Sequence, residues 1–319
     1  MMRKATSYGV YLMPAVILLY LFSCKPEAGK PVAENAGNNA ATSPEKQAKA
    51  FQLTAEFKSY WFAGLAEITS YELEQARYGE RREGDAVLIY VTEPFLEDKQ
   101  VKADGNNPSN ISVLKLNSTK KFVTGIYPYS IMTSTFFPLD GQEHALKVTN
   151  SVQEWCGQVF AQINNREQYE VSAYSYFESE GDQELKLDKD VLENELWTQL
   201  RVDPESLPTG EILAIPALEY LRLAHRELKA YPANASLTKN REFMVYELEY
   251  PELQRTLKIT YNPDFPYVIE GWSETYKSGF GDAAQMMTSS AKKIKTMKIP
   301  YWQRNRNKDV ILRDSLGLK

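Results

Sequence analysis

Few residues in this chain are suited to act as nucleophiles, metal ligands or proton carriers. The 319-residue sequence contains two cysteines, Cys24 and Cys156, and two histidines, His144 and His225. A catalytic thiol needs a nearby base such as histidine, and neither histidine has a supporting pattern around it. A metal site needs clustered histidine, cysteine, aspartate or glutamate. We therefore expect no metal and no cofactor, and we expect Cys156 to be a buried structural thiol.

Acidic side chains gather in one short stretch, residues 178–184. Its four carboxylates lie beside a glycine, but the spacing lacks the aspartate-led layout and closing glutamate of a calcium loop. We interpret the stretch as the solvated tip of a hairpin. A hydrolase that uses paired carboxylates stays an alternative, because such a pair is formed in three dimensions and one sequence does not reveal it. Its candidate residues are Glu72, Glu74, Glu178 and Glu180.

A basic stretch near the C-terminus is the clearest charge feature. It could contact the phosphate groups of lipids or an acidic glycan. The alternative, which we favour, is an edge strand whose exposed lysines prevent pairing with another sheet edge. The net charge of −5 gives no global attraction to nucleic acid, so we expect no nucleic-acid partner. The residues that would contact an anion are Lys292, Lys293, Lys295, Lys298, Arg304 and Arg306.

The first 24 residues have the three-part pattern of a secretory signal. A basic start precedes an apolar run that is too short for a spanning helix and is interrupted by Pro14. The run ends in Leu21-Phe22-Ser23-Cys24, which resembles the lipobox of bacterial lipoproteins. This resemblance implies cleavage before Cys24 and acylation of its sulfur, and more than one acyl chain anchors a protein stably. An ordinary signal peptide with an incidental cysteine is the alternative.

The sequence predicts three regions. Residues 1–23 are the signal peptide. Residues 24–50 are a flexible tether, because proline, glycine and asparagine interrupt them and they lack apolar periodicity. Residues 51–319 form an antiparallel β domain, either as one sheet or as two sub-sheets that divide near residues 200–210. Such a protein is held at the cell envelope, on the periplasmic face or the cell surface, and its membrane partner is engaged through Cys24.

Strand patterns dominate the predicted β domain. Residues 85–92 are apolar on both faces, whereas residues 242–250 and 255–261 alternate apolar and polar side chains with a period of two. Short turns separate consecutive strands, which is typical of antiparallel hairpins. We predict a mainly β protein: an antiparallel curved sheet, either a half-barrel or a sandwich, with one to three short helices.

Two further details of the secondary structure can be predicted. Separate strands are expected at residues 111–117 and 122–127, in quick succession with a further strand at residues 130–137. Residues 190–200 place leucines and a valine on one face of a helix, with Asp188 or Asp190 available as the N-cap. The segment 216–228 fits neither the strand nor the helix period well.

Several motifs between residues 55 and 319 resemble a known family. They are Tyr60-Trp61-Phe62-Ala63-Gly64, residues 71–80 (YELEQARYGE), Val91-Thr92-Glu93-Pro94-Phe95, Gln153-Glu154-Trp155-Cys156-Gly157, residues 175–181 (SYFESEG) and Leu207-Pro208-Thr209-Gly210-Glu211. The family is an uncharacterised group of Bacteroidota envelope lipoproteins, some of which are named septum formation inhibitor Maf. The resemblance implies an envelope lipoprotein and no functional residues, since no activity is established for the group.

The Maf name can be tested on this sequence. True Maf proteins are cytosolic nucleotide pyrophosphatases of α/β fold with a Ser-Pro-Arg-Arg phosphate-contact motif. The nearest string in this chain is Ser43-Pro44-Glu45-Lys46, which lies in the predicted tether. Our first hypothesis is therefore a non-catalytic binding module for a lipid, glycan or protein partner. The second is the carboxylate hydrolase, and the third is nucleotide hydrolysis.

Overall fold

The computed structural model describes residues 53–105 and 107–318, so the predicted signal peptide, Cys24 and the predicted tether lie outside the described residues. The described part of the chain forms a sheet of 16 strands. The first nine strands are β1 (Ala66–Arg77), β2 (Glu80–Leu96), β3 (Val101–Lys102), β4 (Ile111–Thr124), β5 (Tyr127–Pro138), β6 (Lys147–Glu154), β7 (Gly157–Asn165), β8 (Tyr169–Tyr174) and β9 (Gln183–Leu187).

The remaining strands alternate with short helices. These strands are β10 (Val191–Leu192), β11 (Gly210–Ile215), β12 (Tyr231–Asn240), β13 (Phe243–Tyr250), β14 (Arg255–Tyr261), β15 (Ile269–Ser278) and β16 (Gln285–Ile299). The α-helices are α1 (Ala55–Trp61), α2 (Glu193–Val202), α3 (Leu218–Leu223) and α4 (Ile311–Ser315). Single turns of 3-10 helix are η1 (Pro204–Ser206), η2 (Gly281–Ala283), η3 (Tyr301–Gln303) and η4 (Asn307–Val310).

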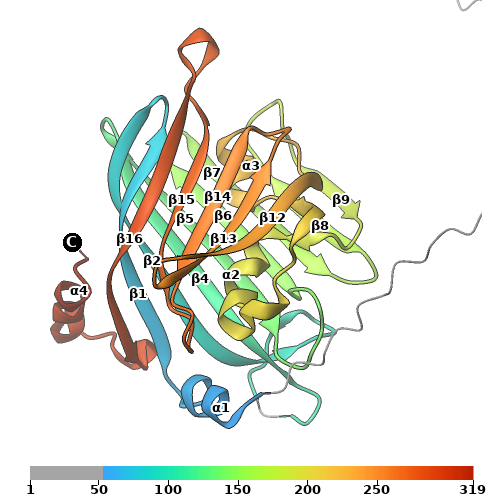
Figure 1. Cartoon of the computed structure of the whole chain (residues 1–319), viewed down its shortest axis with the longest axis vertical. Coiled ribbons are helices and arrows are strands. Elements are labelled where there is room, and N and C mark those ends of the chain that lie inside the picture. The colour runs from blue at the N-terminus through green and yellow to red at the C-terminus, as the bar shows by residue number, and fades with distance from the viewer. Residues whose placement is uncertain (1–52, 106, 319) are drawn as a thin grey trace, which may run out of the picture. The chain divides into compact units, whose positions relative to one another are not determined.

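The strands pair in the order β10-β11-β12-β13-β14-β15-β16-β1-β2-β4-β5-β6-β7-β8-β9, and β3 pairs with β2. Every pair is antiparallel except β10 with β11. The sheet curves round α2 and α3 and does not close, because its two end strands, β9 and β10, have no ladder between them (Figure 1). The predicted curved antiparallel sheet is therefore confirmed, with four short α-helices in the described residues instead of one to three.

The two faces of the sheet have separate apolar clusters. The main core lies on the inner face, where Tyr71 and Leu73 of β1 pack with the leucines of α2. A second cluster joins Ile68 and Val87 on the outer face to the C-terminal residues Leu316 and Leu318. No helix among residues 53–105 and 107–318 is long and apolar enough to cross a bilayer.

The predicted break between residues 117 and 122 is wrong, because β4 runs unbroken from Ile111 to Thr124. Ser118 and Lys120 interrupt the apolar pattern, yet they belong to a strand whose inner face is polar at this point. The predicted N-caps of the helix at 190–200 are also wrong. Helix α2 begins at Glu193, and its first turn is capped by the Glu195 carboxylate, which accepts from the backbone N–H of Leu192 at 3.0 Å.

The favoured interpretation of the basic stretch as an edge strand is wrong. Strand β16, which carries its four lysines, lies in the middle of the sheet between β15 and β1. Its lysines therefore do not protect an edge. The acidic stretch 178–184 does form the turn between β8 and β9, as predicted.

Candidate ligand-binding site

Buried ion pairs fix α2 inside the curve of the sheet. Arg201 of α2 forms a bidentate pair with Glu67 of β1, at 2.7 and 2.8 Å. Arg255 of β14 forms a second bidentate pair with Glu193 of α2, at 2.5 and 2.6 Å, and its Nε donates to Glu274 of β15 at 2.7 Å. All five side chains are buried. The helix is thereby joined to β1 and β14, and through Arg255 to β15.

The Glu67–Arg201 pair is charged despite its burial. Burial alone would raise the pKa of the Glu67 carboxyl, but the Arg201 guanidinium beside it holds that pKa below its usual value. The Tyr60 hydroxyl also donates to Glu67, at 2.5 Å. Because all of these groups are satisfied by one another, we assign this cluster to holding the fold.

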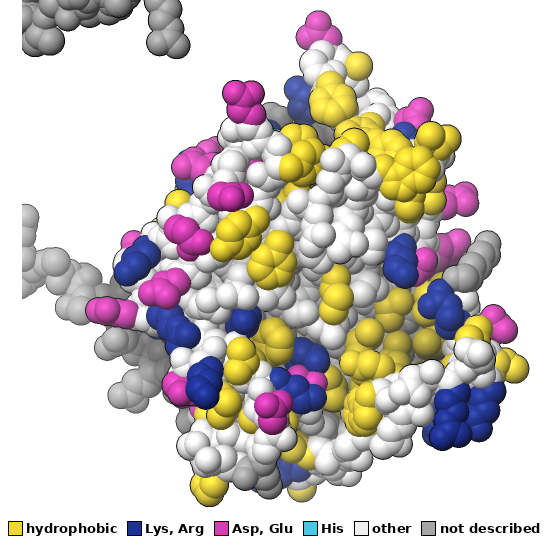
Figure 2. Space-filling model, turned by 180° about the vertical axis from the view of Figure 1, so that it is seen from behind, with side chains coloured by type: hydrophobic (Ala, Val, Ile, Leu, Met, Phe, Trp, Pro, Cys, Tyr) yellow, Lys and Arg dark blue, Asp and Glu magenta, His cyan; other side chains and the backbone are white. Residues whose placement is uncertain are grey.

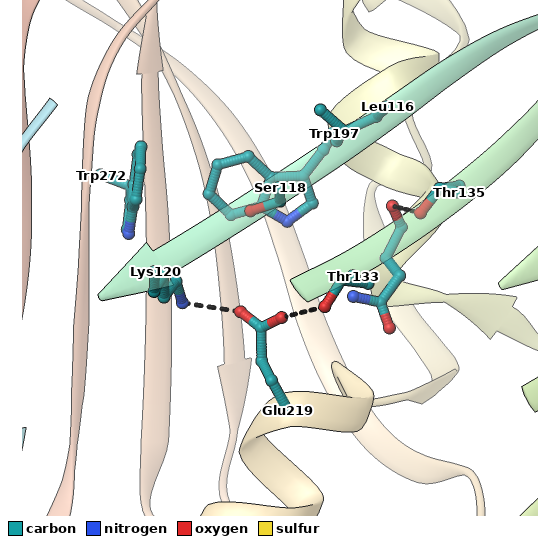
Figure 3. Close-up of a pocket in the computed structure, with 9 residues that line it drawn as sticks. Leu116, Ser118, Lys120, Thr133, Thr135, Trp197, Glu219 and Trp272 are labelled. Atoms are coloured by element: carbon teal, nitrogen blue, oxygen red, sulfur yellow. Dashed lines mark hydrogen bonds and ion pairs between the residues drawn. The ribbon is translucent and has the colours of Figure 1, made fainter. Parts of the chain in front are cut away.

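A cavity of about 20 Å³ lies between α2, α3 and strands β4 and β5 (Figure 3). The carboxylate of Glu219, on α3, accepts hydrogen bonds there from Lys120 Nζ and Thr133 Oγ1, both at 2.6 Å. Burial disfavours the charge of Glu219, but Lys120 lowers the pKa of its carboxyl below the usual value. This volume holds about one water molecule. We name this space the inner cavity; the hydrogen bonds of Glu219 in it join α3 to β4 and β5.

A larger pocket of about 390 Å³ opens where β1 ends and β15 turns into β16, and α3 with the residues after it forms the opposite wall. We name it the mouth pocket. Among the described residues that line it, none is an aspartate or a glutamate. Its aromatic side chains are Tyr78, Tyr220, Tyr276 and Phe280, and its basic side chains are Arg77, Arg226 and Lys277, with His225 beside them.

Arg77 is the least exposed of the arginines and lysines that line the mouth pocket. Its guanidinium donates to the backbone carbonyl of Leu223 at 2.6 Å and to the hydroxyls of Tyr78 and Tyr129 at 3.1 and 3.2 Å. It also lies over the Tyr78 ring, 4.1 Å from the centroid. Within the described residues, Arg77 has no carboxylate partner, and its buried Nε has no hydrogen bond. Its positive charge is thus uncompensated inside a pocket.

The turn between β15 and β16 places an aromatic ring at the entrance of the mouth pocket. Phe280 is 70% exposed and stacks on Tyr78 with 5.4 Å between ring centroids. It lies between Gly279 and Gly281, whose φ angles of +109° and +53° belong to the left-handed region that glycine adopts most readily. A side chain at position 279 would also meet Ala284 Cα at 3.1 Å. The glycines therefore determine where Phe280 lies.

The six basic residues predicted to contact an anion do not form one site. Lys293 pairs with Glu270 at 2.5 Å, and Lys298 donates to the backbone carbonyl of Tyr60 at 2.8 Å while lying over the Tyr60 ring. These two lysines are therefore engaged within the fold. The other four, which are exposed, are Lys292, Lys295, Arg304 and Arg306.

Cys156 is exposed, so the prediction of a buried structural thiol is wrong. The residue lies in the tight turn between β6 and β7, where the side chain projects into solvent. The candidate carboxylates of a hydrolase do not line either cavity, although Glu180 forms a hydrogen bond with a residue that lines the mouth pocket. Glu72, Glu74 and Glu178 are exposed, and Glu180 pairs with His225 at 2.6 Å.

Sequence reasoning missed Arg77, although β1 carries a signal for it. The strand alternates with a period of two, so Arg77 shares the inner face with Tyr71 and Leu73. A charged residue at an inward position needs a partner or a ligand: Glu67, on the same face of β1, has Arg201, whereas Arg77 has no such charged partner among the described residues. The residues opposite Arg77 come from α3, about 146 positions later in the chain, and no local pattern predicts that contact.

Comparison with known proteins finds no protein family that the sequence matches and no curated protein that resembles it. Two solved structures are similar. One is a beta-barrel-like protein of Domain of Unknown Function DUF1849 from Brucella abortus, with 9% identity and a TM-score of 0.43 over 73% of this chain and 98% of that chain. The other is a porin-like protein from Bacteroides uniformis, with 9% identity and a TM-score of 0.23 over 72% of this chain and 95% of that chain.

Proposed function

We propose that this chain is a non-catalytic binding module whose mouth pocket takes a small amphiphile with an acidic head group. The observation that carries the proposal is the uncompensated guanidinium of Arg77 in a pocket with no lining carboxylate among the described residues. A cation that is withdrawn from water without a counter-charge is unfavourable. An acidic group that enters the pocket supplies the missing partner, and guanidinium binds carboxylate or phosphate with two parallel hydrogen bonds.

The rest of the mouth pocket suits an apolar body attached to that acidic group. Leu223 and Leu253 line it together with the four aromatic rings. Its volume of about 390 Å³ lies within the range of about 300–1,000 Å³ that is usual for small-molecule sites. Apolar and aromatic walls with a few convergent polar groups are also the usual composition of such sites. A lipid-like anion therefore fits both the charge and the surface.

The carboxylate hydrolase has less support. That chemistry needs two carboxyl groups about 5–9.5 Å apart in one cleft. Among the described residues that line the inner cavity and the mouth pocket, Glu219 is the one carboxylate, and it is already paired with Lys120. We therefore favour binding over hydrolysis at this site.

We also propose that the module is held at the cell envelope by acylation of Cys24. The support is the lipobox-like sequence that ends at this residue. Cells grown with labelled palmitate should incorporate label into the protein, and Cys24→Ala should abolish the incorporation. An unlabelled wild-type protein would contradict the anchor and leave the proposal for the mouth pocket intact.

Isothermal titration calorimetry of the full chain tests the ligand class with three probes. Decanoate carries an acidic group on an apolar chain, decanol has a comparable chain without the charge, and adenosine monophosphate is an anion with an aromatic base. We expect decanoate to bind at least about tenfold more tightly than decanol, because a hydrogen-bonded charge pair contributes about 1.5–3 kcal/mol. Equal binding of decanoate and decanol would overturn the role of the acidic group, and preferential binding of the nucleotide would overturn the lipid-like class.

A further inference from the structure

The C-terminal segment covers part of the outer face of the sheet. After β16 the chain turns back, and Leu316 and Leu318 pack on Ile68 and Val87. The Ser70 hydroxyl donates to the backbone carbonyl of Leu316 at 2.5 Å. The segment is therefore fixed on β1 and β2 through its last residues and through Tyr301 of η3, which packs against the same cluster, while α4 lies further out (Figure 1).

Several apolar side chains of this segment face solvent. Val310 and Ile311 are 60% and 66% exposed, and Trp302 is 45% exposed. Ile294 of β16 is also exposed and lies beside Gly317, where a Cβ would meet its Cγ2 at 3.1 Å. Four large apolar side chains thus remain uncovered on one part of the outer face.

Basic side chains surround these apolar ones. Lys292, Lys295, Arg304, Arg306 and Lys308 are all exposed, and among the described residues none of them forms an ion pair. Asp309 and Asp314 are the acidic residues of the segment, and Asp309 caps the backbone N–H of Arg306 at 3.1 Å. At its lower right, where the C-terminal segment lies, Figure 2 shows dark blue and yellow side chains close together.

We propose that this C-terminal face, formed by Ile294, Trp302, Val310 and Ile311 with the five basic residues, docks on a bilayer surface that carries anionic lipid. The argument is charge complementarity. The whole chain has a net charge of −5, yet this face is basic, and each lysine or arginine beside an anionic leaflet strengthens binding about fivefold. Exposed aliphatic and tryptophan side chains next to lysine and arginine are typical of surfaces that enter the headgroup region.

The proposal is independent of the mouth pocket. That pocket lies at the start of β16, beside η2, whereas the C-terminal face takes Lys292, Ile294 and Lys295 from later in β16 and its other residues from the segment after Ile299. The two features share no residue, and docking leaves the mouth pocket open to a ligand.

Fluorescence quenching by brominated lipid tests the proposal in the full chain. The difference in emission between the wild-type protein and Trp302→Phe isolates the signal of Trp302. Vesicles of brominated phosphatidylcholine are compared with and without phosphatidylglycerol. We expect quenching of Trp302 in the anionic vesicles alone, and we expect 0.5 M salt to relieve it, since salt screens exposed charges.

Trp155 is the matched control, because it is 68% exposed, more than Trp302, and lies in the turn between β6 and β7. Its signal, isolated with Trp155→Phe, should not be quenched by either vesicle. Combined replacement of Arg304, Arg306 and Lys308 by glutamate should abolish the Trp302 quenching with unchanged thermal unfolding, because these side chains are exposed. Equal quenching in neutral vesicles, equal quenching of both tryptophans, or none at all would overturn the proposal; the last result would indicate a protein partner.

Discussion

The guanidinium of Arg77 donates a hydrogen bond to the backbone carbonyl of Leu223, and this 2.6 Å contact joins the end of β1 to the end of α3. The same helix is held at its other end, where Glu219 pairs with Lys120. Helix α3 therefore separates the inner cavity from the mouth pocket and contacts both. A ligand that binds Arg77 acts directly on the residue that positions this helix.

Replacing Glu219 with glutamine should destabilise the fold strongly. The change leaves Lys120 buried without a counter-charge, which costs about 3–5 kcal/mol in the free energy of unfolding. Urea unfolding followed by circular dichroism measures the effect. The double variant Glu219→Gln/Lys120→Met should recover most of the loss, because both charges are then absent. Equal or greater loss in the double variant would show that the pair is not the origin of the effect.

The stability of the wild-type protein should fall in acid through the same pair. The pKa of Glu219 is lowered from 4.5 in the fold, so the unfolded chain binds the proton more readily. The stabilisation is fully present above the unfolded pKa and is lost as pH falls through the folded pKa. Urea midpoints measured from pH about 5 to 3 should decline less in Glu219→Gln/Lys120→Met than in the wild type. The pKa of Glu67 is also lowered in the fold, so this carboxyl should still cause part of the acid decline in the double variant.

The thiol of Cys156 should react with Ellman's reagent in the native protein without denaturant, because the side chain is exposed. The neighbouring Glu154 carboxylate raises the pKa of this thiol, and the thiolate is the reactive form. Glu154→Gln should therefore accelerate the reaction at neutral pH. In protein purified from membranes of its host, Cys156→Ser should leave no reactive thiol. A thiol that persists in this variant would argue against acylation of Cys24.

Replacing Phe280 with serine should weaken decanoate binding several-fold and leave the unfolding temperature unchanged. Phe280 is largely exposed in the free protein and contributes apolar area at the entrance of the mouth pocket, so a bound chain would shield it from water. Calorimetry measures the affinity. Ile126→Ser is the control, because Ile126 is 81% exposed in the turn between β4 and β5 and does not line the mouth pocket. Equal effects of both changes would contradict a specific role for Phe280.

The fold class could be predicted from the sequence because strand periodicity is local. The alternation in residues 242–250 and 255–261 corresponds to β13 and β14, which pair in one register from Tyr250–Arg255 to Met244–Tyr261. The place of β16 could not be predicted in this way. If every lysine of β16 were solvated, the strand would be an edge strand. Two of them instead have partners in other parts of the chain: Lys293 pairs with Glu270, and Lys298 donates to the backbone carbonyl of Tyr60.

The mouth pocket could not be predicted from local sequence patterns either. The mouth pocket combines the end of β1, the segment around α3 and the turn after β15, which are far apart in sequence. The ion pairs Glu67–Arg201 and Glu193–Arg255 likewise span 134 and 62 positions. A single sequence shows which residues are charged, but it does not show which of them pair with one another in the fold. The inward position of Arg77 in an alternating strand was the one usable signal.

The affinity of decanoate for Arg77→Met, compared with that for Arg81→Met, tests the central proposal most directly. Arg81 is an exposed arginine on β2, close to Arg77 in sequence, and it does not line the mouth pocket. We predict that Arg77→Met weakens decanoate binding by about 10- to 100-fold, whereas Arg81→Met leaves it unchanged, with both variants folded by circular dichroism. Equal decanoate affinity in the two variants would contradict the assignment of Arg77 as the anion-binding group.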